Sequence, residues 1–401
     1  MIKSIREKYN QQFSDQKYQA FLKSVTEAYQ NTPNFRLSET PVFIPDAFRD
    51  QLVQACDDIT DVLVRPDFKK MTDAAIRPEH FVPNEDEHTQ FLVIDFGVCE
   101  AADGTLMPKL IELQGFPSLY FFQHLLAQEF KKHFSVPKNM THLFGGLDTG
   151  GYIKLLRETI VGNQKPENVV LLEVEPHLQS TQIDFWGTSQ LLGVKTICLS
   201  QVIKEGKNLF YRNDKGRLTA IHRIYNRVIF DELDRRPDLK RSFNFTDDLN
   251  VEWAGHPNWF FRISKYTMPF LGGAFVPKTF FLKDLKEMPK DLENYVLKPL
   301  FSFSGQGVVI NVTKQDIDNV EDPTNYILQE KVKYVSALET LSVPHEPSKI
   351  EIRMLMVWQK DWARPRLVNN LIRLSKGEMT GVRYNKNKDW VGASVGFFNK
   401  K

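Results

Sequence analysis

The sequence predicts a mixed protein with both α/β and α+β parts, and three observations support this. A strand–helix–strand pattern over residues 168–199 is typical of a parallel α/β unit. A hairpin pattern over residues 91–114 carries acidic residues inside otherwise apolar strands. From about residue 276 onward the chain is rich in short strands separated by polar loops. We therefore expect several separate sheets.

The composition is that of an ordinary globular protein. The chain has 401 residues, of which 42% are hydrophobic and 25% charged, enough for a large core and about two or three subdomains. The net charge of +2 indicates neither a nucleic-acid nor a membrane partner. Cys56, Cys99 and Cys198 lie far apart and form no C-x-x-C motif, so we expect no disulfide framework and no zinc site. The first residues lack the apolar core of a secretion signal, and no run of 18 apolar residues exists, so a cytoplasmic location is expected.

The first 90 residues predict a helical segment. Apolar residues recur at helical spacing from Ile5 to about Asn31. Asp46 is expected to cap a second helix that continues to about Leu63. Residues 66–87 are polar and loop-like.

The predicted hairpin holds candidate metal ligands. Its first strand, F-L-V-I-D-F at residues 91–96, buries Asp95, and its second strand, K-L-I-E-L, carries Glu112 and is followed by Gln114. Glu112 and Gln114 are two positions apart and share a face. Two carboxylates and an amide oxygen are ligands that Mg²⁺ prefers, whereas a buried acid without a partner is costly. The alternative is that these acids face solvent on a half-exposed sheet.

Residues 165–250 predict a small α/β domain with its own sheet. Strands at residues 168–174 and 195–199 flank a helix at residues 182–192. A hairpin at residues 208–217 and a further strand at residues 220–228 follow.

A glycine-rich hairpin follows at residues 295–310, Y-V-L-K-P-L-F-S-F-S-G-Q-G-V-V-I. Gly305 and Gly307 permit close approach to an anion, Lys298 supplies charge, and Ser304 supplies a hydroxyl donor. No G-K-[ST] follows the glycines, so this is not a Walker P-loop. An ordinary hairpin is the alternative.

Three further features fit a nucleotide site. Lys265 begins an apparent helix upstream of the glycine-rich hairpin, and the alternative for it is a solvated lysine. The strand I-L-Q-E-K-V at residues 327–332 leads into a connecting segment whose backbone suits an adenine edge, although an ordinary core strand fits equally well. Arg353, in E-I-R, and Arg373, on the next apparent strand, suit a phosphoryl group, because guanidinium binds it bidentately. Surface salt bridges are the alternative for this pair.

Taken in order, these motifs resemble those of the ATP-grasp superfamily over most of residues 90–390. The acidic hairpin comes before the lysines, an order similar to the circularly permuted branch that includes glutathionylspermidine synthase. Its D…E-x-N segment resembles Asp95…Glu112-x-Gln114, with Gln114 where the family usually has Asn. The resemblance implies an ATP-grasp fold of circularly permuted order with an inserted small α/β domain that is pre-ATP-grasp-like. It divides the chain into residues 1–90 (helical), 91–160 (metal-binding core), 165–250 (inserted domain) and 255–401 (nucleotide-binding subdomains).

The resemblance also implies an activity, an ATP-dependent, ADP-forming carboxylate–amine ligase that works through an acyl phosphate. The implied cofactors are ATP and Mg²⁺, and the implied partners are a small-molecule carboxylate and an amine. The metal would be held by Asp95, Glu112 and Gln114. The nucleotide would be bound by Lys265, Lys298, Ser304, Gly305, Gly307, Gln329, Glu330 and Val332. The phosphoryl group would be stabilised by Arg353 and Arg373.

Two other activities and several substrate residues stay open at this point. A small-molecule kinase of the same fold is one alternative activity, and a non-catalytic or regulatory nucleotide-binding protein is the other. The candidates for substrate contacts are Glu173, Glu175, His177, Gln182, Tyr225, Arg227, Asp231, Tyr384 and Asn385.

Overall fold

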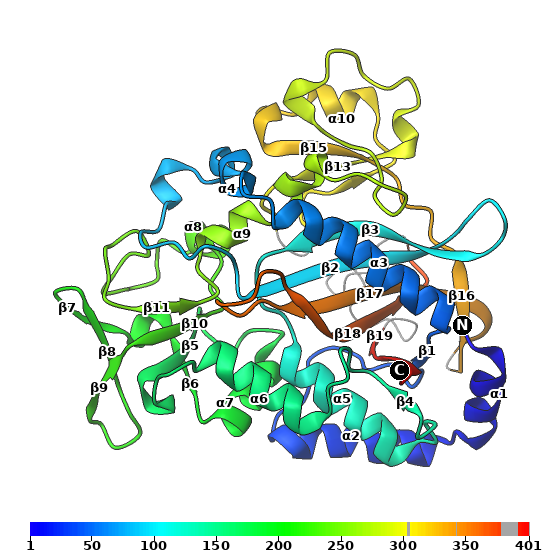
Figure 1. Cartoon of the computed structure of the whole chain (residues 1–401), viewed down its shortest axis with the longest axis horizontal. Helices are drawn as coiled ribbons and strands as arrows, with labels where there is room; N and C mark the ends of the chain where they lie inside the picture. The colour runs from blue at the N-terminus through cyan, green and yellow to red at the C-terminus, as the bar shows by residue number, and fades with distance from the viewer. Residues whose placement is uncertain (303–304, 342, 378–391, 401) are drawn as a thin grey trace.

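The computed structural model describes residues 1–302, 305–341, 343–377 and 392–400 and confirms a mixed α/β fold with several sheets (Figure 1). The largest sheet has six strands, in the order β19-β18-β17-β2-β3, with β16 paired to β17 off this path. Its strands are β2 (Phe91–Glu100), β3 (Leu106–Gln114), β16 (Ser336–Thr340), β17 (Val343–Val357), β18 (Arg366–Ser375) and β19 (Gly392–Ser394).

The predicted acidic hairpin is confirmed and forms one edge of this sheet. Strands β2 and β3 are antiparallel, with Asp95 opposite Glu112. Strand β2 also pairs antiparallel with β17, which places Arg353 opposite Asp95. The early acidic residues and the late E-I-R segment therefore lie in one sheet.

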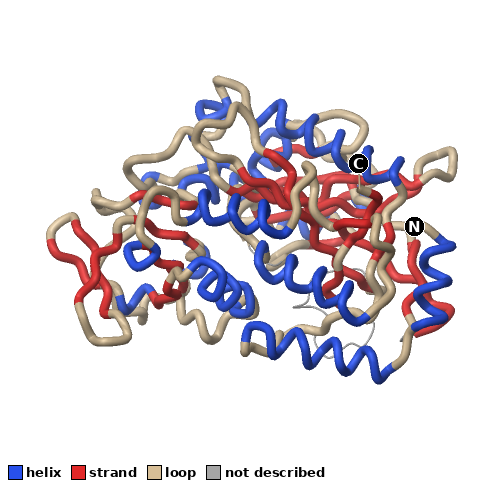
Figure 2. The backbone as a smooth tube through the Cα atoms, turned by 60° about the horizontal axis from the view of Figure 1, so that its bottom comes forward, coloured by secondary structure: helices blue, strands red, loops and turns tan. Residues whose placement is uncertain are grey.

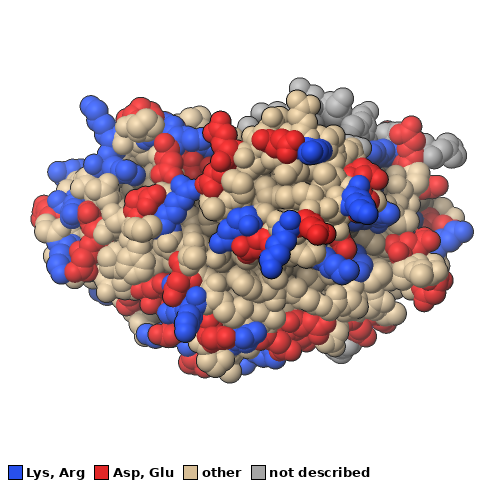
Figure 3. Space-filling view, turned by 90° about the horizontal axis from the view of Figure 1, so that it is seen from above, with Lys and Arg blue, Asp and Glu red and all other residues tan. Residues whose placement is uncertain are grey.

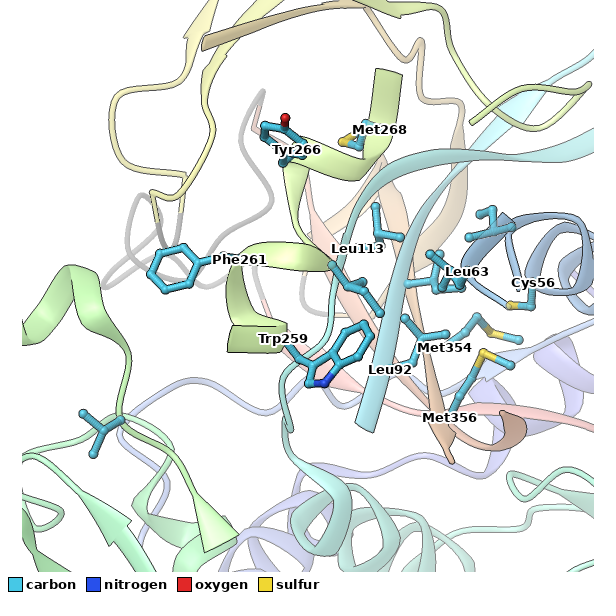
Figure 4. Close-up of a cluster of buried hydrophobic side chains, with 14 of the residues drawn as sticks. Cys56, Leu63, Leu92, Leu113, Trp259, Phe261, Tyr266, Met268, Met354 and Met356 are labelled. Carbon is cyan, nitrogen blue, oxygen red and sulfur yellow. The ribbon is translucent and has the colours of Figure 1, made fainter. Parts of the chain in front are cut away.

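Side-chain alternation gives this sheet one apolar face. Leu92 on β2 and Met354 and Met356 on β17 point toward Leu63 and Cys56 of the helix α3 (Asp46–Leu63), as Figure 4 shows. Because neighbouring strand residues point to opposite faces, the polar side chains between them face the other way. Helix α3 begins at Asp46, one residue earlier than the cap prediction requires, and its N-cap is a proline.

A second sheet lies above the polar face and carries the glycine-rich hairpin. Its strand order is β12-β15-β13-β14, formed by β12 (Thr279–Phe281), β13 (Tyr295–Pro299), β14 (Val309–Ile310) and β15 (Tyr326–Glu330). Strands β13 and β14 pair antiparallel, which confirms the hairpin, although its second arm is only two residues long. The short helix α10 (Lys314–Asp318) follows it.

The predicted parallel sheet is present in residues 165–255. Its order is β11-β10-β5-β6, formed by β5 (Val169–Glu173), β6 (Lys195–Cys198), β10 (Arg223–Asn226) and β11 (Glu252–Ala254), all parallel. The helices α6 (Thr149–Ile160) and α7 (Gln182–Leu192) belong to this unit. The single strand predicted at residues 220–228 is wrong, because the chain changes sheets at His222. Its first part, β9 (Leu218–Ile221), pairs with β8 (Asn208–Arg212), which also pairs with β7 (Ile203–Glu205).

The predicted N-terminal helix is two helices. They are α1 (Lys3–Gln12) and α2 (Asp15–Tyr29), and Ser14 separates them by accepting the backbone N–H of Lys17 at 3.3 Å. A serine cap of this kind starts a new helix. Aromatic residues of both helices pack on α5 (Tyr120–His133) and share an apolar cluster with it.

The two ends of the chain meet in a small sheet of β1 (Val42–Phe43), β20 (Gly396–Asn399) and β4 (Met140–Thr141). Figure 2 shows many of the strands gathered near the middle of the molecule, further strands at its left end, and both termini on its right side. The remaining short helices are α4 (Phe68–Met71), α8 (Phe230–Asp234) and α9 (Asn258–Arg262). Within the described residues, none of the helices has the length and apolar character needed to cross a membrane.

Candidate functional site

A cavity of about 990 Å³ lies between the polar face of the six-stranded sheet and the second sheet. Its walls also include the chain around Ser118 and the end of β10. The predicted residues that line it are Glu112, Gln114, Lys265, Lys298, Gly305, Gln329, Val332, Arg353 and Arg373. The structure thus brings together acidic and basic side chains from distant parts of the sequence.

The floor of the cavity is a network of paired charges. Arg353 makes a bidentate contact with Asp95. Its Nε donates to Oδ1 at 2.7 Å, and its Nη2 donates to Oδ2 at 2.6 Å. Arg373 donates from Nη2 to the same Oδ2 at 2.8 Å and also pairs with Glu351. These residues are neighbours because β17 pairs with both β2 and β18.

Burial and the neighbouring charges shift the pKa values of this network in opposite directions. Asp95 is only 1% exposed, and burial alone would raise the pKa of its carboxyl group, but Arg353 and Arg373 hold the pKa below its ordinary value. Burial would likewise lower the pKa of Arg373, while Glu351 and Asp95 raise it. The buried carboxyl group of Asp95 therefore stays ionised because its two arginine partners are in place.

Tyr334 closes one end of this network. Its hydroxyl donates to Glu351 Oε2 at 3.3 Å, and its ring lies directly over Gly97. A Cβ atom at position 97 would approach the ring to 2.8 Å, so the ring needs a glycine beneath it. The side chain of Glu351 is thus held between Arg373 and Tyr334.

Two buried lysines lie above the floor. Lys265 begins a 3-10 turn (Lys265–Phe270), not an α-helix, and its Nζ donates to the carbonyl of Ser302 at 2.7 Å. Lys298 is on β13, and its Nζ donates to the carbonyl of Ile111 at 2.9 Å. They are 7% and 8% exposed. Since both ammonium groups donate to carbonyls, and no carboxylate of the described residues lies closer than 4.0 Å to either, both can serve an anion in the cavity.

The acidic partner nearest to these lysines is Glu112. Its Oε2 lies 4.0 Å from Lys265 Nζ. Burial lowers the pKa of Lys265, and Glu112 partly opposes this effect. Burial also lowers the pKa of Lys298 to about 8, with Glu112 again opposing. A bound anion would also oppose the effect of burial and favour the charged form of both lysines.

The predicted metal ligands do not all face the cavity. Glu112 and Gln114 line it, and Gln114 donates from Nε2 to the carbonyl of Phe116 at 3.2 Å, which leaves its amide oxygen available. Asp95 lies beneath the two arginines and does not line the cavity. In the described part of the chain, no group of three or more His, Cys, Asp or Glu side chains is arranged to hold a metal.

The glycine-rich loop borders the cavity on one side. Gly305 lines it, whereas Gly307 lies outside the lining with a φ of +72°, where an added Cβ would come within 2.9 Å of Pro299. The neighbouring Gln306 accepts a hydrogen bond from Arg235 at 2.6 Å. Ser304 lies outside the described residues.

The predicted adenine segment is divided between the cavity and the surface. Gln329 and Val332 line the cavity, and Gln329 donates to the carbonyl of Leu110 at 3.4 Å. Glu330 does not line it, and its carboxylate lies 4.0 Å from Lys278. The backbone N–H of Glu330 already donates to the carbonyl of Lys278 at 2.9 Å.

Most of the candidate substrate residues lie away from the cavity. Glu175 is paired with Arg236 at 2.6 Å, and Asp231 is paired with Arg235 at 2.8 Å. His177 is exposed, and Tyr225 is buried in the core. Glu173 and Gln182 are also absent from the lining, and Tyr384 and Asn385 lie outside the described residues. Of this set, Arg227 is the residue that lines the cavity.

Sequence reasoning missed three residues of the site. Ser118 accepts from Arg353, Tyr334 contacts Glu351, and Lys349 lines the cavity. Lys349 could have been found, because it lies two positions before Glu351 on the same strand face. Ser118 and Tyr334 lie outside regular elements and gave no periodic signal.

The cavity is more cationic than the surface. Its lining includes the cations of Arg227, Arg235, Lys265, Lys298, Lys331, Lys333, Lys349, Arg353 and Arg373. The acidic side chains in the lining are those of Glu112 and Glu351. On the face shown in Figure 3, by contrast, basic and acidic residues are interspersed. The cavity therefore favours an anionic ligand.

Comparisons with known proteins bear on the fold. No protein-family model matches the sequence, and neither does any curated protein. The structure is similar to that of a glutathione synthetase-like effector from Globodera pallida in its apo form, with a TM-score of 0.57 and 11% identity over 94% of this chain and 97% of that one. A protein from Methylobacillus flagellatus KT, provisionally assigned as a gamma-glutamylcysteine synthetase, aligns with a TM-score of 0.42 and 11% identity over 89% of each chain.

The first of these similarities extends over nearly the whole chain and shows a glutathione synthetase-like fold. This agrees with the expected mixed α/β architecture at the level of the fold. At 11% identity the similarity carries no residue-by-residue assignment.

Proposed function

We propose that the protein is an ATP-dependent, ADP-forming ligase that joins a carboxylate to an amine through an acyl phosphate. One observation carries this proposal. Two buried lysines, Lys265 and Lys298, and the arginines Arg353 and Arg373 line the same cavity as Glu112. A triphosphate needs this concentration of positive charge, and phosphoryl transfer depends mainly on position and electrostatic stabilisation.

We further propose an ATP-grasp arrangement with the circularly permuted order of glutathionylspermidine synthase-like ligases. The pairing of the early strand β2 with the late strand β17 supports this order. The proposed division remains residues 1–90, 91–160, 165–250 and 255–401, with the third part as the inserted pre-ATP-grasp-like domain.

In this proposal the two sheets hold the nucleotide between them. Lys265 and Lys298 bind the α- and β-phosphates, and Gln329 with the backbone of Glu330 and Val332 contacts the adenine. Gly305 and Gly307 allow the loop to approach the phosphates, and Ser304 adds a donor. Closure of this loop would exclude water, which protects an acyl phosphate from hydrolysis.

The donor set fits Mg²⁺ in part. Glu112 and Gln114 would hold it, because both side chains line the cavity with oxygen atoms. When bound, the ion supplies charge neutralisation at the phosphates. Asp95 is committed to two arginines in this structure, so its assignment to the metal remains a prediction.

Arg353 and Arg373 stabilise the phosphoryl group as it moves from ATP to the carboxylate. Asp95 and Glu351 fix the orientation of these guanidinium groups in advance. Preorganised charge of this kind contributes a few kcal/mol to the stability of a transition state. An amine then displaces phosphate from the acyl phosphate and forms the amide.

A second candidate is a nucleotide-binding protein without turnover. The observation that favours it is the engagement of Asp95 by two arginines, together with Gln114 at the position of the usual asparagine. Such a protein would bind ATP in the same cavity but would lack a complete metal site.

Turnover distinguishes these candidates. Purified protein would be incubated with ATP, Mg²⁺ and pools of amino acids, peptides and polyamines, and ADP and free phosphate would be measured. Phosphate release that requires both an acid and an amine supports the ligase. A phosphorylated product without an amide would instead indicate a kinase. ATP binding without ADP formation in any pool would contradict the ligase.

A further inference from the structure

The cavity extends beyond the lysine pair. Its volume of about 990 Å³ lies at the upper end of the range for small-molecule sites, roughly 300–1,000 Å³. The part near the start of α5 is lined by Asn34, Phe35, Leu119, Ser180, Thr181 and Arg227. None of these residues has a role in holding the nucleotide, so a second ligand has room there.

Arg227 is the only one of these six that carries a positive charge, and it is held rigidly. It follows β10 directly and is 7% exposed. Its Nη1 donates to the carbonyls of Pro117 at 2.8 Å and Ser118 at 3.0 Å. The guanidinium group also lies over the rings of Phe116 and Phe185, at 5.6 and 5.3 Å from their centres.

The charge of Arg227 has no close counter-ion. Among the residues that the structure describes, no carboxylate lies within ion-pair distance of it. The buried acids that act on it from further away are Glu173 and Asp184. Burial raises the pKa of Glu173 to about 8, so this carboxyl group is mostly protonated at neutral pH, whereas Asp184, with a pKa of about 6, is mostly ionised and opposes the charge of Arg227 only from beyond ion-pair distance. A buried cation without a partner is costly, and a bound anion would remove that cost.

Arg227 is also close to the proposed site of phosphoryl transfer. Arg353 donates from Nη1 to the hydroxyl of Ser118 at 2.8 Å, while Arg227 donates to the carbonyl of that same serine. The two guanidinium groups are therefore separated by a single residue. An anion on Arg227 would lie beside a phosphoryl group on Arg353.

We propose that Arg227 binds the carboxylate group that becomes phosphorylated, and that the acid is of amino-acid or small-peptide size. This inference rests on the proposed ligase function. One carboxylate oxygen forms a bond to the γ-phosphorus, the bond from that phosphorus to the β–γ bridging oxygen breaks, and ADP leaves with the electron pair. The apolar side chains of Phe35 and Leu119 and the hydroxyls of Ser180 and Thr181 suit an acid with both apolar and amide groups.

The test compares acids with their amides. Binding of amino acids and of di- and tripeptides, each paired with its C-terminal amide, would be measured by calorimetry with and without a non-hydrolysable ATP analogue. Wild-type protein should bind at least one acid about tenfold more tightly than its amide, as expected for a charged hydrogen bond. Arg227→Gln should lose this preference, and Arg227→Lys should retain part of it.

Arg223→Gln is the matched control. Arg223 lies on the same strand β10, donates to the carbonyls of Ile160 and Thr159 and pairs with Glu252, but does not line the cavity. The Arg223→Gln variant should keep the preference for acids over amides even if its free energy of unfolding is lower than that of the wild type. Equal binding of every acid and its amide to wild-type protein would overturn the proposal, as would an unchanged preference in Arg227→Gln.

Nucleotide binding separates this inference from the proposed function. Arg227→Gln should bind the ATP analogue with wild-type affinity, because the lysine pair is untouched. If the wild-type protein fails to bind the analogue but still prefers acids, the ligase proposal fails while the carboxylate site stands. If the analogue binds and the preference for acids is absent, only the role of Arg227 is lost.

Discussion

Two groups of largely buried arginines line this cavity, and they differ in how their charge is balanced. Arg353 and Arg373 are paired with Asp95, and Arg373 also with Glu351. Arg227 has only carbonyl and aromatic contacts of comparable closeness among the described residues. The first group is neutralised by the protein itself, while the second leaves a positive charge for a ligand.

The two groups differ in whether their positive charge is compensated before a ligand binds. A buried ion pair is difficult to break, because removing one partner leaves the other charged and desolvated. The paired arginines are therefore fixed in geometry before any ligand arrives, which suits the proposed stabilisation of a phosphoryl group. The charge of Arg227 is instead expected to be compensated only in the complex.

The largest effect should come from Asp95→Asn. This change keeps the shape of the side chain but removes the charge that balances two arginines. The free energy of unfolding should fall by about 3–5 kcal/mol, measured by urea denaturation at pH 7. Asp184→Asn is the comparison, because Asp184 is equally buried but accepts only the backbone N–H groups of Phe121 and Phe122. Because burial raises the pKa of Asp184 to about 6, its ionisation opposes folding at pH 7, and this neutral variant should cost little or no stability. Equal losses for the two variants would contradict the special role of the arginine pairs.

Glu173→Gln should stabilise the protein at alkaline pH. Burial raises the pKa of Glu173 from 4.5 to about 8, so ionisation opposes folding increasingly as the pH rises from 4.5 to 8. The stability of the wild type should fall over this window relative to the variant. At pH 8 the variant should be more stable by on the order of 3 kcal/mol, and below pH 4.5 the two should agree. Parallel stability curves from pH 4.5 to 8 would show that Glu173 does not titrate in this way.

Lys298→Met should weaken ATP binding by roughly tenfold to a hundredfold, since one charged hydrogen bond is lost. The protein should remain folded, because a buried ammonium with a lowered pKa is replaced by an apolar side chain. Lys333→Met, an exposed lysine of the same lining, is the control and should bind ATP almost normally. Calorimetric titration with ATP measures both.

The same lysine predicts a pH dependence. Because the pKa of Lys298 is about 8 in the free protein, the ammonium is progressively lost above that pH. ATP affinity of the wild type should therefore decline as the pH rises from 8 to 10. Lys298→Arg keeps its charge throughout this range and should show a flatter profile. A wild-type affinity that is constant from pH 8 to 10 would argue against contact between Lys298 and a phosphate.

The smallest effect should come from Tyr334→Phe. This variant loses one hydrogen bond, 3.3 Å long, to a carboxylate that keeps its pairing with Arg373. The free energy of unfolding should fall by about 1 kcal/mol. Thermal denaturation beside wild type would detect it, and a loss as large as that of Asp95→Asn would mean that Tyr334 positions Arg373 as well.

Much of the architecture could be predicted from strand patterns. Apolar alternation located the hairpin of β2 and β3, the strand pair of β17 and β18 and the parallel unit of β5 and β6. Tertiary pairing could not be predicted from the same patterns, because alternation shows which face is buried but not which strand lies beside it. The break between α1 and α2 was missed because both helices keep an apolar stripe across Ser14.

For the site, the sequence predicted which charged residues line the cavity better than it predicted the contacts that each of them makes. The charged residues Glu112, Lys265, Lys298, Arg353 and Arg373 were selected from the sequence, and all of them line one cavity. The sequence could not show that Asp95 contacts two arginines, since that contact depends on a pairing between positions 258 apart in the chain. Nor could it show that no carboxylate of the described residues lies within ion-pair distance of Arg227, because that depends on every element packed around this side chain.

The pairing of β2 with β17 also bears on how the polypeptide is made. Asp95 leaves the ribosome long before Arg353, and at roughly 5–20 residues per second the interval is on the order of 10–50 seconds. Through that time the apolar strand β2 has an unpaired edge, which is the kind of surface that promotes aggregation. Expression yield should therefore depend on chaperone supply, and the floor of the cavity can be assembled only near the end of translation.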